Sequence, residues 1–351
     1  MTQGALLGSH RKLDPDRTWY LPDGTVLLPH HFSTRSAVRA AAASARGRVL
    51  WRILPKVTSL RQYIAEEIAT DHADGLLSRR EALRRLALLG LGGGAAVALI
   101  ASCGKHPQRP SAAPSPSKPP GMDRAEPTEP ITWGGPNGQL SGAWAQAHNA
   151  RRGVLVIHEN KGLNDWVRSV AGRFAGAGYS ALAIDLLSEQ GGTGHFTDPA
   201  QATAALAAVP HDRFIADLNS GLDELQNRVP GGKIAVVGFC FGGGLVWQLL
   251  ASGAPHVSAA VPFYGPLPDN PDFGGSKRAA VLAIYAALDT RVTESEAAAK
   301  AALERAGLIN DIVVEPHADH AFFNDTGPRY NAAAAADAWQ QVLEWFGRYL
   351  A

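Results

Sequence analysis

The chain has 351 residues, enough for one large α/β domain and an appendage. Its 33 Lys and Arg residues nearly balance 32 Asp and Glu residues, and the net charge of +1 gives no indication of a nucleic-acid partner. The first hundred residues are rich in Arg, an asymmetry typical of a targeting segment before a folded domain. The two cysteines, Cys103 and Cys240, stand in separate motifs that each need a free thiol, so we predict no disulfide framework.

Residues 1–77 form an N-terminal extension to which the sequence assigns no fold. Residues 1–56 are rich in Arg and Ala and show no clear periodicity. No methionine stands between Met1 and Met122, which motivates the hypothesis of a later start, for instance at Val57 through a non-AUG codon. We therefore expect the extension to be unstructured or to reflect a wrongly assigned start. Within it, a short amphipathic helix capped by Ser59 would place four side chains on one face: Leu60, Tyr63, Ile64 and Ile68.

Residues 78–103 resemble an export signal. Arg79 and Arg80, followed by Leu83, resemble a twin-arginine motif, and the apolar run 86–101 is short and Gly-rich, as a signal core can be. The run ends in Ile-Ala-Ser-Cys, which resembles a lipobox whose cysteine, Cys103, is lipidated before cleavage. We predict export through the machinery that reads Arg79 and Arg80. The protein would then be lipid-anchored to the membrane on the extracytoplasmic side, or be periplasmic or extracellular. An uncleaved anchor and a single buried helix are the alternatives.

Residues 104–130 are dense in Pro and Ser and predict an extended tether. From residue 131 to the end, strand patterns alternate with helix patterns. Apolar runs such as Val154-Leu-Val-Ile and Ile234-Ala-Val-Val indicate strands buried on both faces. Residues 131–351 therefore predict a doubly wound, mostly parallel α/β domain. The expected strands lie near 131 and 140 and at 153–158, 179–186, 233–239, 257–264, 280–286 and 311–315; the expected helices span 166–177, 199–227, 245–250, 294–306 and 332–349.

A Gly-Phe-Cys-Phe-Gly-Gly motif at 238–243 follows a predicted buried strand and precedes a helix. Small residues two positions before and after a nucleophile permit the tight turn that lifts its side chain above the sheet. The N–H groups that open the helix can bind an oxyanion and lower a thiol pKa. This pattern predicts Cys240 as a nucleophile, and a buried structural cysteine in an ordinary turn is the alternative.

Three further candidates follow strand ends, where functional residues of such a sheet gather: Glu159, Asp289 and His320. The chain order nucleophile, acid, histidine is that of α/β-hydrolases. Asp289 could instead merely cap the next helix. His317 and His320 have the spacing of a metal pair, but no third ligand cluster is visible, so we predict neither metal nor cofactor.

Five motifs together resemble the dienelactone hydrolase family, and in particular its exported, signal-bearing branch. They are His158-Glu-Asn-Lys-Gly-Leu, the motif around Cys240, Val261-Pro-Phe-Tyr-Gly, Leu288-Asp289 and the segment 320–331. The resemblance implies an α/β-hydrolase fold, with Cys240 as nucleophile, His320 as general base and acid, and Asp289 as the residue that orients His320. It also implies that Glu159 holds the resting thiol and that the backbone N–H groups of Phe241 and Asn160 form the oxyanion hole.

The resemblance further implies a basic residue for a substrate carboxylate. Arg329, Lys161 and, more weakly, Arg213 are candidates, but none matches the lactonase pattern. Tyr264 and Phe322 are expected as pocket walls or core. The predicted function is hydrolysis of an ester or lactone, a small-molecule substrate, through a cysteinyl acyl-enzyme. A ligand-binding lipoprotein on a hydrolase scaffold is the first alternative. A thiol redox protein is the second, and it would need a resolving cysteine beside Cys240.

Overall fold

The computed structural model describes residues 19–20, 26–27, 59–102, 118–148 and 151–351. The chain divides into two compact units, Met1–Lys56 and Val57–Ala351. In the first, β1 (Trp19–Tyr20) pairs antiparallel with β2 (Val26–Leu27). The predicted lipidation residue Cys103 and the predicted tether up to residue 117 lie outside the described residues.

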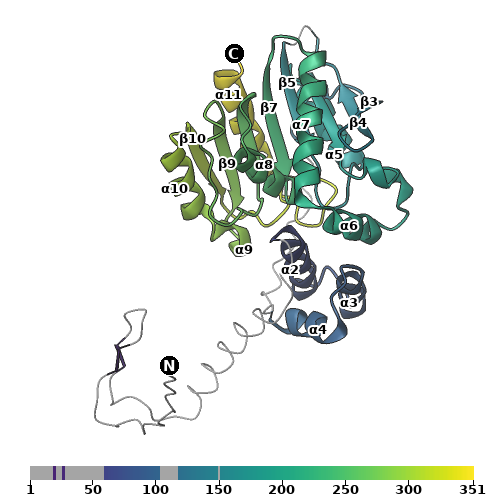
Figure 1. Ribbon diagram of the computed structural model, residues 1–351, viewed down its shortest axis with the longest axis vertical. Coiled ribbons are helices and arrows are strands. Elements are labelled where there is room, and N and C mark those ends of the chain that lie inside the picture. Colours follow the sequence, from purple (N-terminus) through teal and green to yellow (C-terminus); the bar gives the residue numbers. More distant parts are fainter. Residues whose placement is uncertain (1–18, 21–25, 28–58, 103–117, 149–150) are drawn as a thin grey trace, which may run out of the picture. The chain divides into compact units, whose positions relative to one another are not determined.

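An eight-stranded sheet forms the centre of the second unit (Figure 1). Its order is β3-β4-β6-β5-β7-β8-β9-β10, and the strands from β6 to β10 are all parallel. β3 and β4 complete one edge in antiparallel pairing. The strands are β3 (Glu129–Gly134), β4 (Gln139–Ala145), β5 (Arg152–Ile157), β6 (Ser180–Asp185), β7 (Lys233–Phe239), β8 (Val257–Phe263), β9 (Ala280–Ala286) and β10 (Asn310–Glu315).

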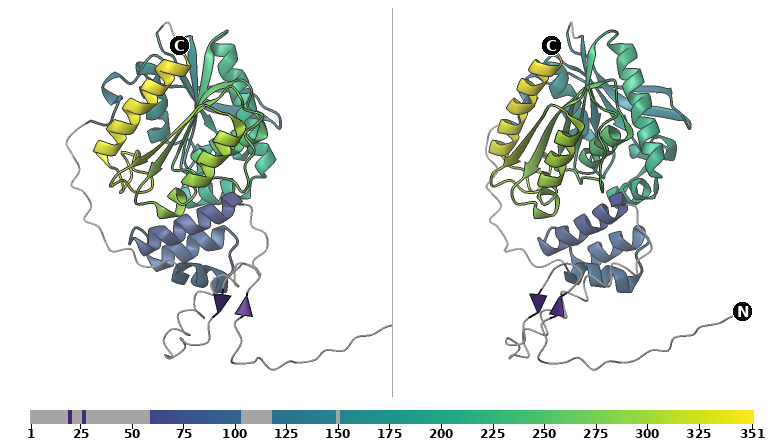
Figure 2. Two further views of the ribbon diagram at one scale, coloured as in Figure 1. Left: turned by 90° about the vertical axis from the view of Figure 1, so that its left-hand side faces the viewer. Right: turned by 60° about the vertical axis from the view of Figure 1, so that its left-hand side comes forward.

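Helices cover both faces of this sheet, because its central strands are apolar on both sides (Figure 2). On one face, α5 (Asp165–Gly176) meets α11 (Ala332–Tyr349) through Phe174 and Trp339, whose ring centroids lie 4.8 Å apart. On the other face, α7 (His211–Arg228) packs beside α8 (Phe241–Ser252). The short α9 (Thr290–Thr293) follows β9, and α10 (Glu296–Ala306) packs on β10. The predicted doubly wound α/β fold is confirmed.

Two local boundaries differ from the prediction. The helical stretch expected over 199–227 is two helices, α6 (Pro199–Ala208) and α7, because Pro210 has no N–H to continue the first. The domain also begins before residue 131. A 3-10 turn, η1 (Met122–Arg124), precedes β3, and the Glu126 N–H donates to the Gly172 carbonyl of α5 at 2.9 Å. The described end of the predicted tether therefore packs on the domain.

Three helices stand where the sequence predicted an unstructured extension and a signal. They are α2 (Ser59–Ala73), α3 (Arg79–Leu88) and α4 (Gly93–Ser102), and they pack against one another. Leu60, Tyr63, Ile64 and Ile68 of α2 are all buried, as the periodicity predicts. The apolar run predicted for 86–101 breaks at Gly90 and Gly92, so neither half is long. Among the described residues, no helix is long and apolar enough to cross a membrane.

Candidate active site

Cys240 occupies the sharp turn between β7 and α8. Its φ of 56° lies in the left-handed region, which a non-glycine residue adopts only when the surroundings force it. The backbone around Cys240 is tightly packed. A Cβ on Gly238 would lie 2.1 Å from the Gly242 carbonyl oxygen. A Cβ on Gly242 would lie 2.5 Å from the Ile157 carbonyl oxygen. The two glycines therefore let the turn approach both itself and the neighbouring strand, as a nucleophile elbow requires.

His320 and Asp289, the predicted base and its orienting acid, lie side by side in the structure. The His320 Nδ1 and the Asp289 Oδ2 lie 2.6 Å apart, and both side chains are buried. Burial favours the neutral imidazole, but the Asp289 carboxylate outweighs it and raises the pKa of His320. Burial likewise disfavours the Asp289 carboxylate, and His320 outweighs it, so the pKa of Asp289 is lowered. Asp289 also begins α9, yet its side chain makes no cap bond there, so its carboxylate serves the histidine.

Glu159 does not hold the resting thiol, which differs from the prediction. Its Oε2 accepts a hydrogen bond from the Asn324 Nδ2 at 2.8 Å, and its Oε1 has no partner among the described residues. Burial raises the pKa of this carboxyl. Glu159 is thus a buried acid near the nucleophile with one oxygen free to accept a proton or a hydrogen bond.

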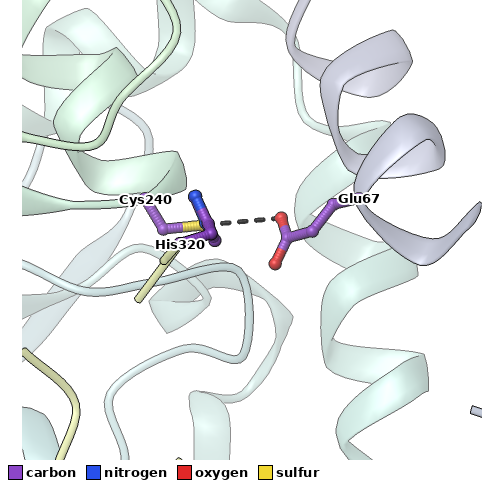
Figure 3. A group of neighbouring side chains, drawn as sticks. All are labelled: Glu67, Cys240 and His320. Atoms are coloured by element: carbon purple, nitrogen blue, oxygen red, sulfur yellow. Dashed lines mark hydrogen bonds between the residues drawn. The ribbon is translucent and has the colours of Figure 1, made fainter. Parts of the chain in front are cut away.

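The carboxylate beside the nucleophile belongs to Glu67 of α2, which the sequence interpretation missed (Figure 3). Glu67 Oε2 lies 3.4 Å from the Cys240 Sγ and accepts a hydrogen bond from the Asn160 Nδ2 at 3.0 Å. The Tyr63 hydroxyl, one turn earlier on α2, lies 3.4 Å from the Cys240 Sγ and 3.3 Å from the His320 Nε2. The hydroxyl therefore stands between nucleophile and base.

These neighbours keep the thiol protonated in the arrangement described. Burial raises the pKa of Cys240 most strongly, and the Glu67 and Glu159 carboxylates raise it further. The Tyr63 hydroxyl and the Phe241 backbone N–H oppose this effect but do not overcome it. Cys240 is only 1% exposed, so its thiol is covered in this arrangement.

Two aromatic residues that the sequence predicted as pocket walls or core lie on the side of His320. Tyr264 and Phe322 are fully buried, and the Tyr264 ring centroid lies 5.1 Å from that of His320. Phe322 meets the same tyrosine edge-on at 5.5 Å. Tyr264 carries the uncommon φ of 36°, and its hydroxyl has no partner among the described residues. Tyr264 therefore offers a donor within the site as well as a wall.

The three basic candidates have different surroundings. Arg329 donates to Asp71 Oδ1 at 2.8 Å and to Asp74 Oδ2 at 2.6 Å, both on or next to α2. Lys161 is exposed, and its charge lowers the pKa of Glu159 against the larger effect of burial. Arg213 binds two carboxylates and the Leu186 carbonyl oxygen on α7's side of the sheet. Arg213 is a structural residue, whereas Arg329 pairs with the carboxylates of α2 and Lys161 lies near Glu159.

A metal could be held in the described part of the chain by Glu67, Cys240 and His320, whose donor atoms all lie within 4.8 Å of one another (Figure 3). Thiolate, imidazole and carboxylate are ligands that suit zinc. Two of them, Cys240 and His320, are the predicted nucleophile and base, so a bound ion would occupy the atoms predicted to react. His317, whose spacing from His320 allowed a metal pair as an alternative, is not part of this group of described residues.

The part of the chain that carries Cys240, Asp289 and His320 is similar to known proteins. Residues 140–350 match the model of the dienelactone hydrolase family. The chain belongs to the dienelactone hydrolase family. A Salmonella typhi protein named "Putative carboxymethylenebutenolidase" is 35% identical over 208 residues, 56% of this chain and 77% of the relative. A protein of the same name from Escherichia coli K12 is 34% identical over 209 residues, 56% of this chain and 76% of the relative.

A solved structure from metagenomic libraries, described as the dienelactone hydrolase-like promiscuous phosphotriesterase P91, is similar to this member of the family. It shares 27% identity and a TM-score of 0.56, covering 65% of this chain and 100% of that chain. The family match includes Cys240, Asp289, His320 and Glu159 but begins after α4. Tyr63 and Glu67 thus reach the site from outside the part of the chain that defines the family.

Proposed function

We propose that this hydrolase cleaves a carboxylic ester or lactone through a cysteinyl acyl-enzyme, with Cys240 as nucleophile. The observation that carries the proposal is the buried His320–Asp289 pair, bonded at 2.6 Å, facing a cysteine on a strained strand-to-helix turn. The carboxymethylenebutenolidase relatives support a lactone as one substrate class. An aspartate on Nδ1 leaves Nε2 free to exchange a proton with the thiol.

The reaction divides into acylation and hydrolysis. His320 takes the thiol proton, and Sγ bonds to the acyl carbon. The carbonyl electron pair moves onto oxygen, and the backbone N–H groups of Phe241 and Asn160 would donate hydrogen bonds to this oxyanion. The C–O bond to the alcohol breaks as His320 returns the proton to the departing oxygen. Water then attacks the thioester, and His320 takes its proton and passes one to the departing sulfur. A lactone yields one hydroxy acid, and an ester yields an alcohol and an acid.

The test compares the full chain with Cys240→Ala on a dienelactone, a neutral lactone and short aryl esters. We expect turnover in the parent chain, loss of it in the variant, and an acyl adduct on Cys240 by mass spectrometry after a rapid quench. An unchanged thermal unfolding curve would show that the variant is folded. Retained turnover in Cys240→Ala would remove the cysteine from the mechanism. A preference for the dienelactone would indicate an anion site, with Arg329 and Lys161 as the next residues to vary.

We also propose that the protein is exported through Arg79 and Arg80 and anchored to the membrane by lipid at Cys103. Both arginines are exposed at the start of α3, which suits recognition from solution. In a membrane fractionation, Cys103→Ala should move the protein to the soluble fraction, and Arg79→Lys with Arg80→Lys should stop export. Protein that stays in the pellet after Cys103→Ala would favour an uncleaved anchor instead.

A further inference from the structure

One face of α2 covers the proposed nucleophile with side chains that can hydrogen-bond to it. Tyr63 places its hydroxyl against both Cys240 and His320, and Glu67 places a carboxylate 3.4 Å from Sγ. An attacked carbonyl carbon must come within about 3–3.5 Å of the nucleophile. Tyr63 and Glu67 each place an oxygen 3.4 Å from Sγ. They therefore occupy space that a substrate carbonyl would need on this side of Cys240. With α2 docked, Cys240 is covered on the side of α2.

Charge pairs fasten the same face of α2 to the entrance of the site. Glu67, Asp71 and Asp74 follow one another at helical spacings of four and three residues, so they point the same way. Glu67 meets Asn160, and the other two carboxylates meet Arg329, whose side chain is only 13% exposed. On the far side of Tyr63, the guanidinium of Arg291 lies 4.3 Å from the ring centroid. The entrance thus presents a complementary surface to this helix.

The docked arrangement also contains repulsion. Glu67 raises the pKa of Asp71 after the larger effect of burial, and Arg329 opposes both. The same carboxylate lies near the buried Glu159 and the Cys240 thiol and raises the pKa of each. Crowded acids of one sign oppose the docking that Arg329 and Asn160 favour. The acids therefore weaken, without abolishing, the contact of a helix that also packs against α6 and α8.

We propose that the entrance of the active site is a docking surface for α2, and that the segment 59–102 is a removable internal inhibitor of the hydrolase. This inference rests on the proposed function for its consequence, though not for the docking itself. Cleavage before Cys103, the site predicted for signal processing, would separate α2, α3 and α4 from the domain together. The segment would then keep turnover low until export is complete, and its removal would free Arg329 from Asp71 and Asp74.

The test measures the alkylation rate of Cys240 by iodoacetamide, which needs no turnover. Full-length Cys103→Ser leaves Cys240 as the single thiol. Asp71→Asn with Asp74→Asn removes the two ion pairs that join α2 to Arg329 and leaves the one with Asp319 at 3.8 Å, and we expect alkylation at least tenfold faster. Glu66→Gln is the matched control: it removes a charge from the same helix, and its side-chain carboxylate accepts a hydrogen bond from Gln62 at 2.9 Å. That variant should alkylate at the parent rate.

A second measurement covers the case in which the double variant unfolds. A specific protease site placed between residues 105 and 117 allows the segment to be cut from the folded full chain. We expect faster alkylation after the cut, and a return to the slow rate when a peptide of residues 59–102 is added. Equal rates in the parent, the double variant and the cut protein would overturn the docking inference.

Ester turnover in the same samples separates this inference from the proposed function. Faster alkylation without any turnover would reject the hydrolase while keeping the docking surface. Turnover in the intact chain as fast as in the cut protein would keep the hydrolase and reject the inhibitor. A rise of both the alkylation rate and the ester turnover after the cut would support the two proposals.

Discussion

At the scale of single residues, a hydroxyl lies between Cys240 and His320, the proposed nucleophile and base. The Tyr63 oxygen lies 3.4 Å from Cys240 Sγ and 3.3 Å from His320 Nε2, while Asp289 holds the other ring nitrogen. The imidazole is therefore already oriented, and only the contact with the thiol is interrupted. The orienting bond can be tested separately from the nucleophile.

Asp289→Asn should reduce kcat while leaving the protein folded. An asparagine keeps the shape but cannot stabilise the imidazolium, and its amide favours the wrong tautomer. The expected loss is on the order of 10²–10⁴-fold, as for orienting aspartates generally. Steady-state kinetics on an aryl ester, with the protein already cut at the engineered site, measures it. A loss below about threefold would show that Asp289 does not orient the base.

The same pair should stabilise the fold over a limited pH range. The folded pKa of His320 is raised, so its contribution is present below about pH 6.5 and is lost as pH rises through the folded value. The folded pKa of Asp289 is lowered, so its contribution is present above about pH 4 and is lost as pH falls through the folded value. His320→Gln should therefore lower the unfolding free energy most between about pH 4 and 6.5. Urea unfolding at pH 5.5 and 9 measures this; a larger effect at pH 9 would contradict it.

Much of the site follows from sequence, because its residues carry local signals. The glycines around Cys240 are required by backbone contacts within a few residues, and His320 and Asp289 follow strands that an apolar run reveals. The role of Glu67 has no such signal. It depends on α2 folding back over a distance of 173 residues to reach Cys240. The buried stripe of α2 and its aligned acids could have indicated a docked helix, but not the surface it meets.

At the scale of elements, the loop that carries His320 is fastened to α5 by a buried ion pair. Arg173 of α5 is fully buried and donates to both carboxylate oxygens of Asp325, at 2.9 and 3.0 Å. It also donates to Ser169 at 3.0 Å, whereas its Nε and Nη1 have no partner among the described residues. Arg173 thus adds to the bonds of His320 with Asp289 and of Asn324 with Glu159 in holding this loop.

Arg173→Met should destabilise the domain by about 3–5 kcal/mol, because Asp325 would be left without its partner. Thermal or urea unfolding measures the loss. Arg173→Met combined with Asp325→Leu should recover most of it, since no unpaired charge remains. A single variant as stable as the parent would show that the pair contributes little. A double variant no better than the single would indicate that packing around Arg173, rather than charge, is responsible.

Element boundaries show what sequence patterns can and cannot settle. The strand and helix order of residues 131–351 is predicted because each apolar run has a period that matches one structure. The break between α6 and α7 follows from Pro210, a signal that was present in the sequence. The packing of residues 118–128 on α5 was hidden, because proline-rich composition predicts extension and says nothing of a neighbouring helix. Whether such a segment is extended or packed on a domain is decided by its tertiary contacts.

At the scale of the whole molecule, the described chain combines a family domain with three helices outside the family match. Leu76, Leu88 and Val97, three of the four large apolar side chains that are exposed among the described residues, belong to the segment 59–102. The central strands β5 and β7, by contrast, are buried almost throughout. This contrast predicts unequal local stability within one chain.

Hydrogen exchange should therefore show α2, α3 and α4 opening more readily than the sheet. Helices held by an entrance contact can detach without unfolding the domain, whereas β5 and β7 exchange only in global unfolding. We expect amides of α2 to exchange at least tenfold faster than those of β5 in the uncut chain. Asp71→Asn with Asp74→Asn should increase this difference between the exchange rates of α2 and β5. The control is α11, a helix that covers the sheet and should exchange slowly. Protection of α2 equal to that of α11 would mean that the segment is a permanent part of the domain, and that Tyr63 and Glu67 belong to the working site.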